Sequence, residues 1–267
     1  MKILFLGDVV GISGCSKIMN NLKSEIEKND IDFVILNGEN SSGPGVGINI
    51  NTCKDFFNCG VDVITTGNHV WDQKEIMSYI EKENRLLRPF NLYEPCPGKG
   101  FEIYETSQNI KVGVLNLMGN VFMKKCDDVF IISKKFMENH KLKKDYDLLI
   151  VDFHGEITSE KNAIGHLFDG NASLVVGTHT HIPTNDARIL KGGTGYQTDA
   201  GMCGDYDSVI GMNKDNSINR FLKKNSTKHF PATGDATLSG VIVECDIKTG
   251  LATKIQSYIC GGQLENI

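Results

Sequence analysis

The sequence predicts an α/β protein in which mixed, mostly parallel sheets are flanked by helices. Short apolar runs alternate with segments of helical spacing along most of the chain, and each run is continuous. Continuous runs are typical of parallel strands covered on both faces. The composition, 40% hydrophobic and 23% charged over 267 residues, is that of an ordinary globular protein. We expect one domain, residues 1–267, because no repeat, low-complexity segment or long linker divides the chain.

The N-terminal part of the chain alternates between strands and helices. Apolar runs that end in glycine or polar residues predict strands at residues 2–6, 33–36 and 61–66. Helical spacing predicts helices at residues 16–28, 52–58 and 73–83. In the first of these helices, Ile18, Leu22 and Ile26 recur on one face, which predicts that this face is buried.

Farther along the chain, two hairpins are expected beside further strands and helices. Residues 101–106 and 111–117 predict one hairpin, and residues 240–247 and 253–259 predict a second. Between them, a helix is expected at 131–142, followed by buried strands at 148–151 and 174–176. The hairpins predict some antiparallel pairing within the sheets.

Charge and cysteine content exclude several classes of protein. The net charge of −5 and the pI of about 5.8 provide no basic field for polyanions, so an RNA partner is not supported by charge. No apolar run approaches the ~20 residues of a membrane helix, so we expect no membrane contact. With no secretory signal and no Cys-x-x-Cys pair among the eight cysteines, we expect a cytoplasmic protein with reduced thiols.

Polar residues able to bind a metal follow five of the predicted strands. They are Asp8, Glu39, Asn40, Asn68, His69, His154, His179 and His181. The carboxyl ends of strands in an open α/β sheet line one edge, so these distant residues are expected to converge. Each of them alone would be interpreted as a helix cap, a turn residue or a structural histidine. Their occurrence at five strand ends together favours a metal site.

The residue types narrow the choice of metal. Carboxylates, amide oxygens and three or more histidines suit borderline divalent ions and are too rich in nitrogen for Ca²⁺. The set also contains too many ligands for one tetrahedral ion. We therefore expect two divalent metal ions ~3.5–4 Å apart and bridged by a carboxylate, with Fe or Mn favoured and Zn as the alternative.

Other conspicuous residues receive a structural interpretation. His140 is expected on a solvated helix face, and His166 is expected to be a structural residue of a short helix rather than a ligand. The glycine-rich loop 43–47 lacks the lysine and the spacing of a P-loop, so it is expected to provide only flexibility. Asp199 is a weaker candidate ligand at the rim of the site, and the sequence assigns no role to His229.

Four segments carry a family resemblance. They are Leu6-Gly-Asp-Val-Val-Gly11, Asn37-Gly-Glu-Asn40, Thr66-Gly-Asn-His-Val-Trp-Asp72 and Gly177-Thr-His-Thr-His181. These motifs resemble the calcineurin-like metallophosphoesterases and, more narrowly, their YmdB-like branch, which is similar to 2′,3′-cyclic-nucleotide 2′-phosphodiesterases. The resemblance implies a sandwich of two sheets between two helical layers (αββα). It is also compatible with a homo-oligomer, a dimer or a tetramer.

The resemblance also implies roles for the strand-end residues. One ion would be held by Asp8, Glu39, Asn40 and His181. The other would be held by Glu39, Asn68, His154 and His179. His69 would remain unligated and act as the catalytic acid beside the scissile phosphate. Val10 and Glu39 stand where the broader superfamily has a histidine and an aspartate, and both are expected in the YmdB-like branch.

The predicted function is hydrolysis of cyclic nucleotides, 2′,3′-cyclic and also 3′,5′-cyclic, or of related phosphodiesters by a metal-bridged hydroxide. The expected partner is this small phosphodiester substrate. One alternative is a metal-containing nucleotide- or RNA-binding regulator with little catalysis. Another is a phosphomonoesterase or a nuclease, because metal motifs specify phosphoryl chemistry better than they specify the substrate.

Overall fold

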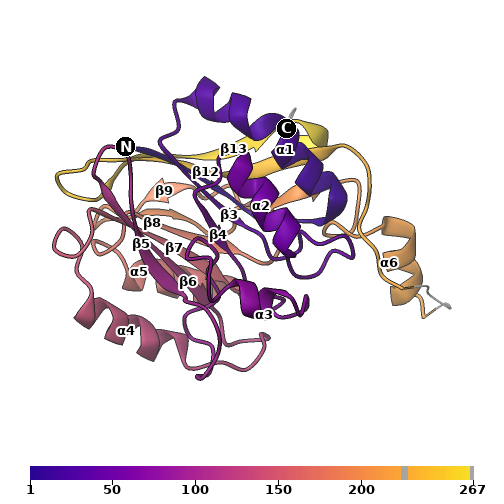
Figure 1. The fold of residues 1–267 in the computed structure, drawn as a ribbon, viewed down its shortest axis with the longest axis horizontal. Coiled ribbons are helices and arrows are strands. Elements are labelled where there is room, and N and C mark those ends of the chain that lie inside the picture. Colours follow the sequence, from indigo (N-terminus) through magenta and orange to yellow (C-terminus); the bar gives the residue numbers. More distant parts are fainter. Residues whose placement is uncertain (224–227, 265–267) are drawn as a thin grey trace.

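The computed structural model describes residues 1–223 and 228–264 and contains two β-sheets packed face to face (Figure 1). The first sheet has the order β2 (Asp8–Val9), β11 (Met202–Asp205), β12 (Ala236–Cys245), β1 (Lys2–Leu6), β3 (Phe33–Asn37) and β4 (Val63–Thr65), with β13 (Ala252–Cys260) paired to β12. The second has the order β5 (Phe101–Glu105), β6 (Lys111–Met118), β7 (Leu148–His154), β8 (Leu174–Thr178), β10 (Gly195–Gln197) and β9 (Arg188–Ile189).

Helices cover the outer face of each sheet. The first sheet carries α1 (Gly11–Asn29), α2 (Ile50–Asn58) and the single turn α3 (Ile76–Tyr79). The second sheet carries α4 (Val129–Asn139) and α5 (Thr158–Leu167). In contrast, α6 (Lys214–Phe221) stands off from both sheets at one end of the molecule (Figure 1), and a 3-10 turn, Gly262–Leu264, follows β13. None of the described helices is long and apolar enough to cross a membrane.

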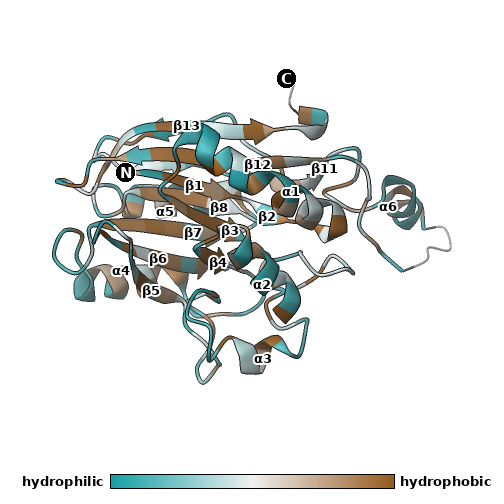
Figure 2. Cartoon of the chain, turned by 45° about the horizontal axis from the view of Figure 1, so that its top comes forward, coloured by the Kyte–Doolittle hydropathy of each residue, from teal (hydrophilic) through white to brown (hydrophobic). Residues whose placement is uncertain are grey.

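Three buried clusters hold these layers together. In β1, Ile3 and Phe5 belong to the cluster between the sheets, whereas Leu4 and Leu6 belong to the cluster beneath α1 and α2. A third cluster, which contains Phe153, lies between the second sheet and its helices. Because side chains alternate between the faces of a strand, the order of layers is helix, sheet, sheet, helix. In Figure 2 the central strands, such as β1, β3 and β7, are mainly hydrophobic, whereas helices such as α1 and α4 carry both hydrophilic and hydrophobic residues.

The predicted strands are all present, and both hairpins are confirmed as the pairs β5–β6 and β12–β13. The sheets are mixed, as predicted, but the parallel majority is narrow: among the described strands, six pairings are parallel and five are antiparallel. The main reason is β12, which pairs antiparallel with β1, β11 and β13.

Three predicted helices are confirmed with shifted ends, as α1, α2 and α4. The helix predicted at residues 73–83 is wrong in extent, since only Ile76–Tyr79 is α-helical. Side chains before this turn bind the loop at Val46 and the first residue of α2 instead of continuing a helix. Gln73 Nε2 donates to the Val46 carbonyl at 2.9 Å, and Glu75 Oε1 accepts from the Ile50 amide at 2.9 Å. Tertiary hydrogen bonds thus override the helical spacing of this segment.

A buried hydrogen-bond network joins the carboxyl ends of strands from the two sheets. Asn37 ends β3, Thr65 ends β4, and both side chains donate to Asp152 in β7, Asn37 at 2.9 Å. Thr178, at the end of β8, donates to the other oxygen of Asp152 at 2.7 Å. We refer to these four residues as the strand-end network. It fixes the edges of the two sheets against each other, directly behind the residues predicted to bind metal.

We expect Ile35→Ala, in the fully buried cluster between the sheets, to lower the free energy of unfolding by about 2–5 kcal/mol, because it removes packed methylenes and leaves a cavity. Urea denaturation of the metal-free protein measures this loss. Ile131→Ala in α4, where the side chain is 55% exposed, is the control and should change stability by less than about 0.5 kcal/mol. Equal losses in both variants would contradict the placement of the core.

Candidate metal centre

The predicted ligands lie at the edge where the parallel strands of both sheets end. Asp8 begins β2 directly after β1, and Glu39 and Asn40 follow β3. Asn68 and His69 follow β4, His154 is the last residue of β7, and His179 and His181 follow β8. Asp8, Glu39 and His154 are almost completely buried. The fold thus brings together predicted ligands that are widely separated in the sequence, from Asp8 to His181.

One group of side chains surrounds Nε2 of His154. This atom lies 3.1 Å from Asn68 Oδ1, 3.1 Å from His179 Nδ1 and 3.6 Å from Glu39 Oε1. Nitrogen ligands lie ~2.0–2.1 Å from a zinc ion, so a nitrogen–nitrogen separation near 3 Å is compatible with two ligands of one ion. These four residues are the set that the resemblance assigns to a single ion.

A second group surrounds Asp8. Its Oδ1 atom lies 3.8 Å from His181 Nε2 and 3.7 Å from His154 Nδ1, and its Oδ2 atom accepts from the His179 amide at 2.9 Å. Asn40 lines the same cavity as His181, and its Nδ2 atom donates to the Gly45 carbonyl at 2.9 Å. With its amide nitrogen engaged, Asn40 can present its carbonyl oxygen to a ligand.

The hydrogen-bond network assigns the tautomers of two histidines. The hydroxyl of Thr178 donates to Asp152, so it can accept from His154 Nδ1, 3.0 Å away. His181 Nδ1 lies 2.8 Å from the Ile210 carbonyl, which can only accept. Both rings therefore carry the proton on Nδ1 and present the Nε2 lone pair, His154 toward Asn68 and His181 toward Asp8. A buried partner on one nitrogen is the usual way in which a metal-binding imidazole is oriented.

His179 has the opposite tautomer. Its Nε2 atom lies 3.0 Å from the Glu156 carboxylate, so the proton belongs on Nε2 and the lone pair on Nδ1. That lone pair faces the Nε2 lone pair of His154 at 3.1 Å. Burial lowers the pKa of His154 well below its usual value and lowers the pKa of His179 to about 4, so neither ring gains a bridging proton at neutral pH. Two facing lone pairs repel each other, and a cation bound between them would remove this repulsion.

Within the described part of the chain, the buried carboxylates of Asp8 and Glu39 also lack a positively charged partner. Asp8 Oδ1 and Glu39 Oε2 are buried and have no hydrogen-bond partner among the described residues. Burial, together with the Asp199 charge, raises the pKa of Asp8 to about 7, and burial raises the pKa of Glu39 to about 8. Unpaired carboxylates are costly to bury, and a divalent ion removes this cost. Orphaned oxygens and imidazole lone pairs thus fit the metal that the sequence predicts.

Within residues 1–223 and 228–264, no group of three or more His, Cys, Asp or Glu side chains has the geometry to hold a metal ion as it stands. The imidazoles and carboxylates contact one another, and amide oxygens supply two of the predicted ligands. The assignment of Asp8, Glu39, Asn40, Asn68, His154, His179 and His181 as ligands therefore stays a prediction. The support for it is the chemistry of the donor set.

His69 is placed differently from the predicted ligands. Its backbone amide donates to Glu39 Oε1, while its ring is about one-third exposed, with Nδ1 2.7 Å from Asp72 Oδ2. The carboxylate of Asp72 holds the proton on Nδ1 and leaves Nε2 for a ligand in the cavity. This placement agrees with an unligated side chain beside the centre.

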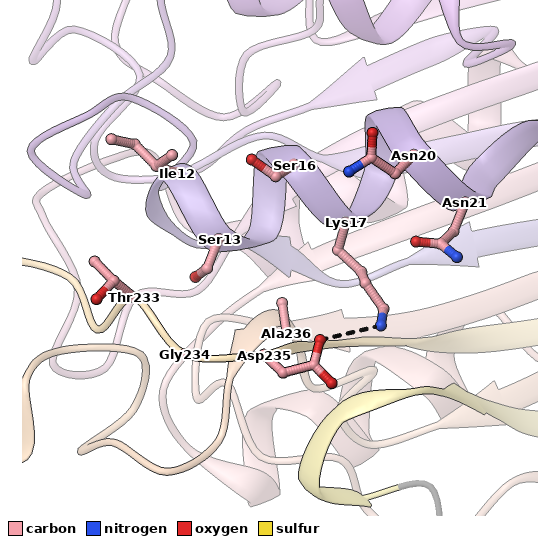
Figure 3. A pocket seen from close by; sticks show the side chains of 10 residues that line it. All are labelled: Ile12, Ser13, Ser16, Lys17, Asn20, Asn21, Thr233, Gly234, Asp235 and Ala236. Atoms are coloured by element: carbon pink, nitrogen blue, oxygen red, sulfur yellow. Dashed lines mark hydrogen bonds and ion pairs between the residues drawn. The ribbon is translucent and has the colours of Figure 1, made fainter.

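The centre opens into a cavity of about 440 Å³. Its lining includes the polar side chains His69, His179 and His181 and the apolar side chains Ile210 and Met212. A separate hollow of about 410 Å³ lies between α1 and residues 233–236 (Figure 3). Its charged side chains, Lys17 and Asp235, pair with each other at 3.3 Å, and none of the predicted ligands lines it. The chemistry therefore points to the first cavity.

Sequence reasoning missed the residues that support the centre. Thr178 and Asp152 orient His154, and Glu156 binds His179. Asp152 and Glu156 lie two positions before and two positions after His154, and this spacing could have indicated that they lie on the same side of the strand end as His154. Lys161 gave no signal, because a lysine in a helix is ordinarily expected in water.

Asp199, the weaker candidate ligand, forms a buried ion pair with Lys161. It also accepts from the Thr180 hydroxyl at 2.7 Å and the Gly201 amide at 2.8 Å. These contacts fix the loop that carries His179 and His181, whose φ values of +96° and +66° are unusual for residues other than glycine. Such backbone strain is characteristic of functional sites that the surrounding structure holds in place.

The fold and this centre define a two-sheet α/β protein with histidines and carboxylates gathered at its strand ends. The chain belongs to the YmdB-like protein family, whose sequence model matches residues 4–258. It is 41% identical to the 2′,3′-cyclic-nucleotide 2′-phosphodiesterase of Bacillus subtilis strain 168, over 97% of this chain and 97% of that protein.

Two crystal structures are similar to this one, each with a TM-score of 0.89. One is a hypothetical protein from Thermus thermophilus, 36% identical over 97% of this chain and 99% of that chain. The other is described as a novel phosphatase of Mycoplasma pneumoniae, 37% identical over 97% of this chain and 93% of that chain. The fold is therefore shared with both of these proteins.

We expect the chelated, metal-free protein to lose stability as the pH rises from about 6.5 to about 8.5. A carboxyl group whose pKa is raised on folding stabilises fully below its unfolded pKa, and this contribution is lost as the pH rises through the folded pKa. For Asp8 and Glu39 the unfolded values are 3.8 and 4.5, and the folded pKa values are about 7 and about 8. The lowered histidine pKa values act in the opposite direction only below about 6.5.

Thermal unfolding across this pH range measures the effect. Glu39→Gln, which removes one of the titrating groups, is the control and should flatten the profile. Added Mn²⁺ should raise the melting temperature most at the alkaline end, where the carboxylates are already ionised. A metal-free profile that rises between pH 6.5 and 8.5 would show that these carboxyls are not buried as described.

Proposed function

We propose that this protein is a metal-dependent phosphodiesterase with two divalent ions, acting on 2′,3′-cyclic nucleotides or related phosphodiesters. The observation that carries the proposal is the convergence of orphaned Asp8 and Glu39 oxygens with the lone pairs of three neutral histidines. The name of the B. subtilis relative, at 41% identity over nearly the whole chain, supports the same activity. The order of layers is that of the calcineurin-like metallophosphoesterase sandwich, to which we assign the fold.

The donor set divides into two groups that share Glu39. Asp8, Asn40 and His181 would hold one ion with Glu39, and Asn68, His154 and His179 would hold the other. Mixed nitrogen and oxygen donors without thiolates suit Fe²⁺ or Mn²⁺, and Zn²⁺ as the alternative. When bound, such a pair supplies a nucleophilic hydroxide near neutral pH and neutralises the phosphoryl oxygens.

The chain's own residues position the substrate and move the proton. Hydrolysis adds water to phosphorus and breaks the bond from phosphorus to the leaving oxygen, which must then take up a proton. His69 in its doubly protonated form is the acid for this step, because its ring lines the cavity, its Nδ1 donates to Asp72, and the proton on Nε2 can pass to the leaving oxygen. The carboxylate of Asp72 holds the ring in this orientation, as a base partner orients a catalytic histidine elsewhere.

We expect the purified protein to hydrolyse bis(p-nitrophenyl) phosphate and 2′,3′-cyclic nucleotides in the presence of Mn²⁺. Hydrolysis should stop when a chelator is added. A panel that includes 3′,5′-cyclic nucleotides and p-nitrophenyl phosphate separates a phosphodiesterase from a phosphomonoesterase. Elemental analysis of protein purified without added metal identifies the ions. Nucleotide binding without metal-dependent turnover would favour a regulator with little catalysis.

We expect His69→Ala to retain both metal ions and to lower kcat by roughly 10²–10⁴-fold, because general-acid help has about this value. Steady-state kinetics with metal analysis of the same sample measures the two effects separately. A smaller loss for a substrate with a p-nitrophenolate leaving group, which needs no proton, would identify His69 as the acid.

Asp8→Ala and His181→Ala are the contrasting variants, since each should lose a metal ion as well as activity. His166→Ala, at an exposed position of α5, is the matched control and should change neither. Metal loss in His69→Ala would assign that residue to coordination instead. Unchanged metal content in Asp8→Ala would refute the ligand assignment.

A further inference from the structure

Two cavities adjoin at the centre and lead away from it toward α6. The cavity of about 440 Å³ at the predicted ligands and a second of about 390 Å³ share two lining residues, Ile210 and His229. Arg220 and Phe221, at the end of α6, line the second cavity. The two cavities therefore neighbour each other between the predicted ligands and α6, the helix that stands off from the sheets in Figure 1.

Ile210 is held in a strained conformation at the junction of the two cavities. Its φ of +48° is unfavourable for a β-branched residue. Its carbonyl binds His181 Nδ1, while its side chain is 50% exposed. Next to it, Gly211 has a φ of +90°, and a Cβ there would lie 2.6 Å from Val10. The turn thus presents an apolar side chain to the cavities at a cost in strain, which is expected where a ligand makes contact.

The segment of the sequence between Asp215, in the first turn of α6, and Asp235 is basic, although the chain as a whole is acidic. Residues 216–234 contain no Asp or Glu. Their described cations, Arg220, Lys223 and Lys228, are exposed, and none forms an ion pair within residues 1–223 and 228–264. A local excess of unpaired positive charge attracts a polyanion even when the net charge of the chain is −5.

Exposed aromatic rings lie among these cations. Phe221 is 81% exposed and Phe230 is 44% exposed. Two hydrogen bonds join α6 and the residue before it to the segment at Phe230. The Asn213 amide donates to the Phe230 carbonyl at 3.0 Å, and the Ser217 hydroxyl lies 3.0 Å from His229 Nε2. Rings that offer a stacking face beside cations that follow a backbone are the means by which proteins bind single-stranded nucleic acid.

We propose that the second cavity and α6 bind a single-stranded RNA whose terminal phosphodiester enters the metal centre. Arg220, Lys223 and Lys228 face the phosphates, Phe221 stacks on a base, and Ile210 packs against the terminal nucleoside. The proposal rests on the proposed phosphodiesterase function and narrows its substrate class to oligoribonucleotide ends. A protein partner would use the apolar residues but not the unpaired cations, and it would not need continuity with the centre.

The test compares two substrates on the full chain loaded with Mn²⁺. One is methyl p-nitrophenyl phosphate, which reaches only the centre, and the other is a short single-stranded RNA that ends in a 2′,3′-cyclic phosphate. We expect the double variant Arg220→Ala/Phe221→Ala to lower the ratio of kcat/KM for the RNA to kcat/KM for the small ester by about tenfold or more. The salt dependence of the RNA reaction should also become shallower.

The matched control is Lys134→Ala/Ile131→Ala, which removes an exposed cation and an exposed apolar side chain from α4 on the other sheet. This variant should leave the ratio unchanged. An unchanged ratio in the α6 variant, or an equal fall in the control, would overturn the proposal. So would sedimentation showing that the α6 variant only dissociates an oligomer, because the surface would then be an interface between copies.

If the proposed phosphodiesterase function is wrong, the experiment gives a different result from the failure of the RNA proposal. In that case neither substrate is turned over, whereas the binding of a fluorescent single-stranded RNA still reports on α6. Weaker RNA binding by the α6 variant in a fluorescence anisotropy titration would support the RNA site without catalysis. Equal binding by wild type and variant would refute it.

Discussion

The constraint on which the rest of the structure depends is the convergence of electron pairs at the strand ends. Asp8 and Glu39 present buried oxygens without donors among the described residues, and His154 and His179 present lone pairs to each other at 3.1 Å. Packing alone cannot neutralise this arrangement, since apolar contacts supply no positive charge. The energy needed to bury these acceptors must come from a bound cation, or from protonation of the carboxyls. The proposed metal binding would therefore be thermodynamically coupled to folding at this edge.

The two-sheet architecture explains how these residues can be held in place. Neither sheet carries the full donor set: Asp8, Glu39 and Asn68 come from the first sheet, and His154 and His179 come from the second. The strand-end network crosses between them, because Asn37 and Thr65 of one sheet and Thr178 of the other all donate to Asp152. A single buried carboxylate thus fixes the register of the sheets and, through Thr178, the tautomer of His154. Movement of one sheet relative to the other would separate the donors.

Sequence reasoning recovered the parts of this arrangement that are local. Continuous apolar runs identified β1, β3, β7 and β8, and the residues after them marked the shared edge, since chain direction alone places carboxyl ends together in parallel strands. The length of α3 could not be predicted, because loop contacts of Gln73 and Glu75 decide it. Lys161 and Asp199 were missed as a pair for a similar reason, since 38 positions separate them and only the fold brings them into contact. Local patterns thus specify elements and candidate ligands, whereas supporting contacts depend on tertiary placement.

The net charge of the chain differs from the charge close to the predicted centre. A net charge of −5 argued against a polyanionic partner when it was taken as a property of the whole chain. The charges are, however, unevenly placed: residues 216–234 carry no acid, and Arg220 lines the cavity of about 390 Å³ that shares Ile210 and His229 with the cavity at the predicted ligands. Electrostatic attraction falls off within about 8–10 Å at physiological salt, so the groups next to the cavity govern an approaching phosphate and distant carboxylates do not. In the proposed complex, ions held at the centre and the basic side chains beside α6 would together provide a favourable approach for a phosphodiester.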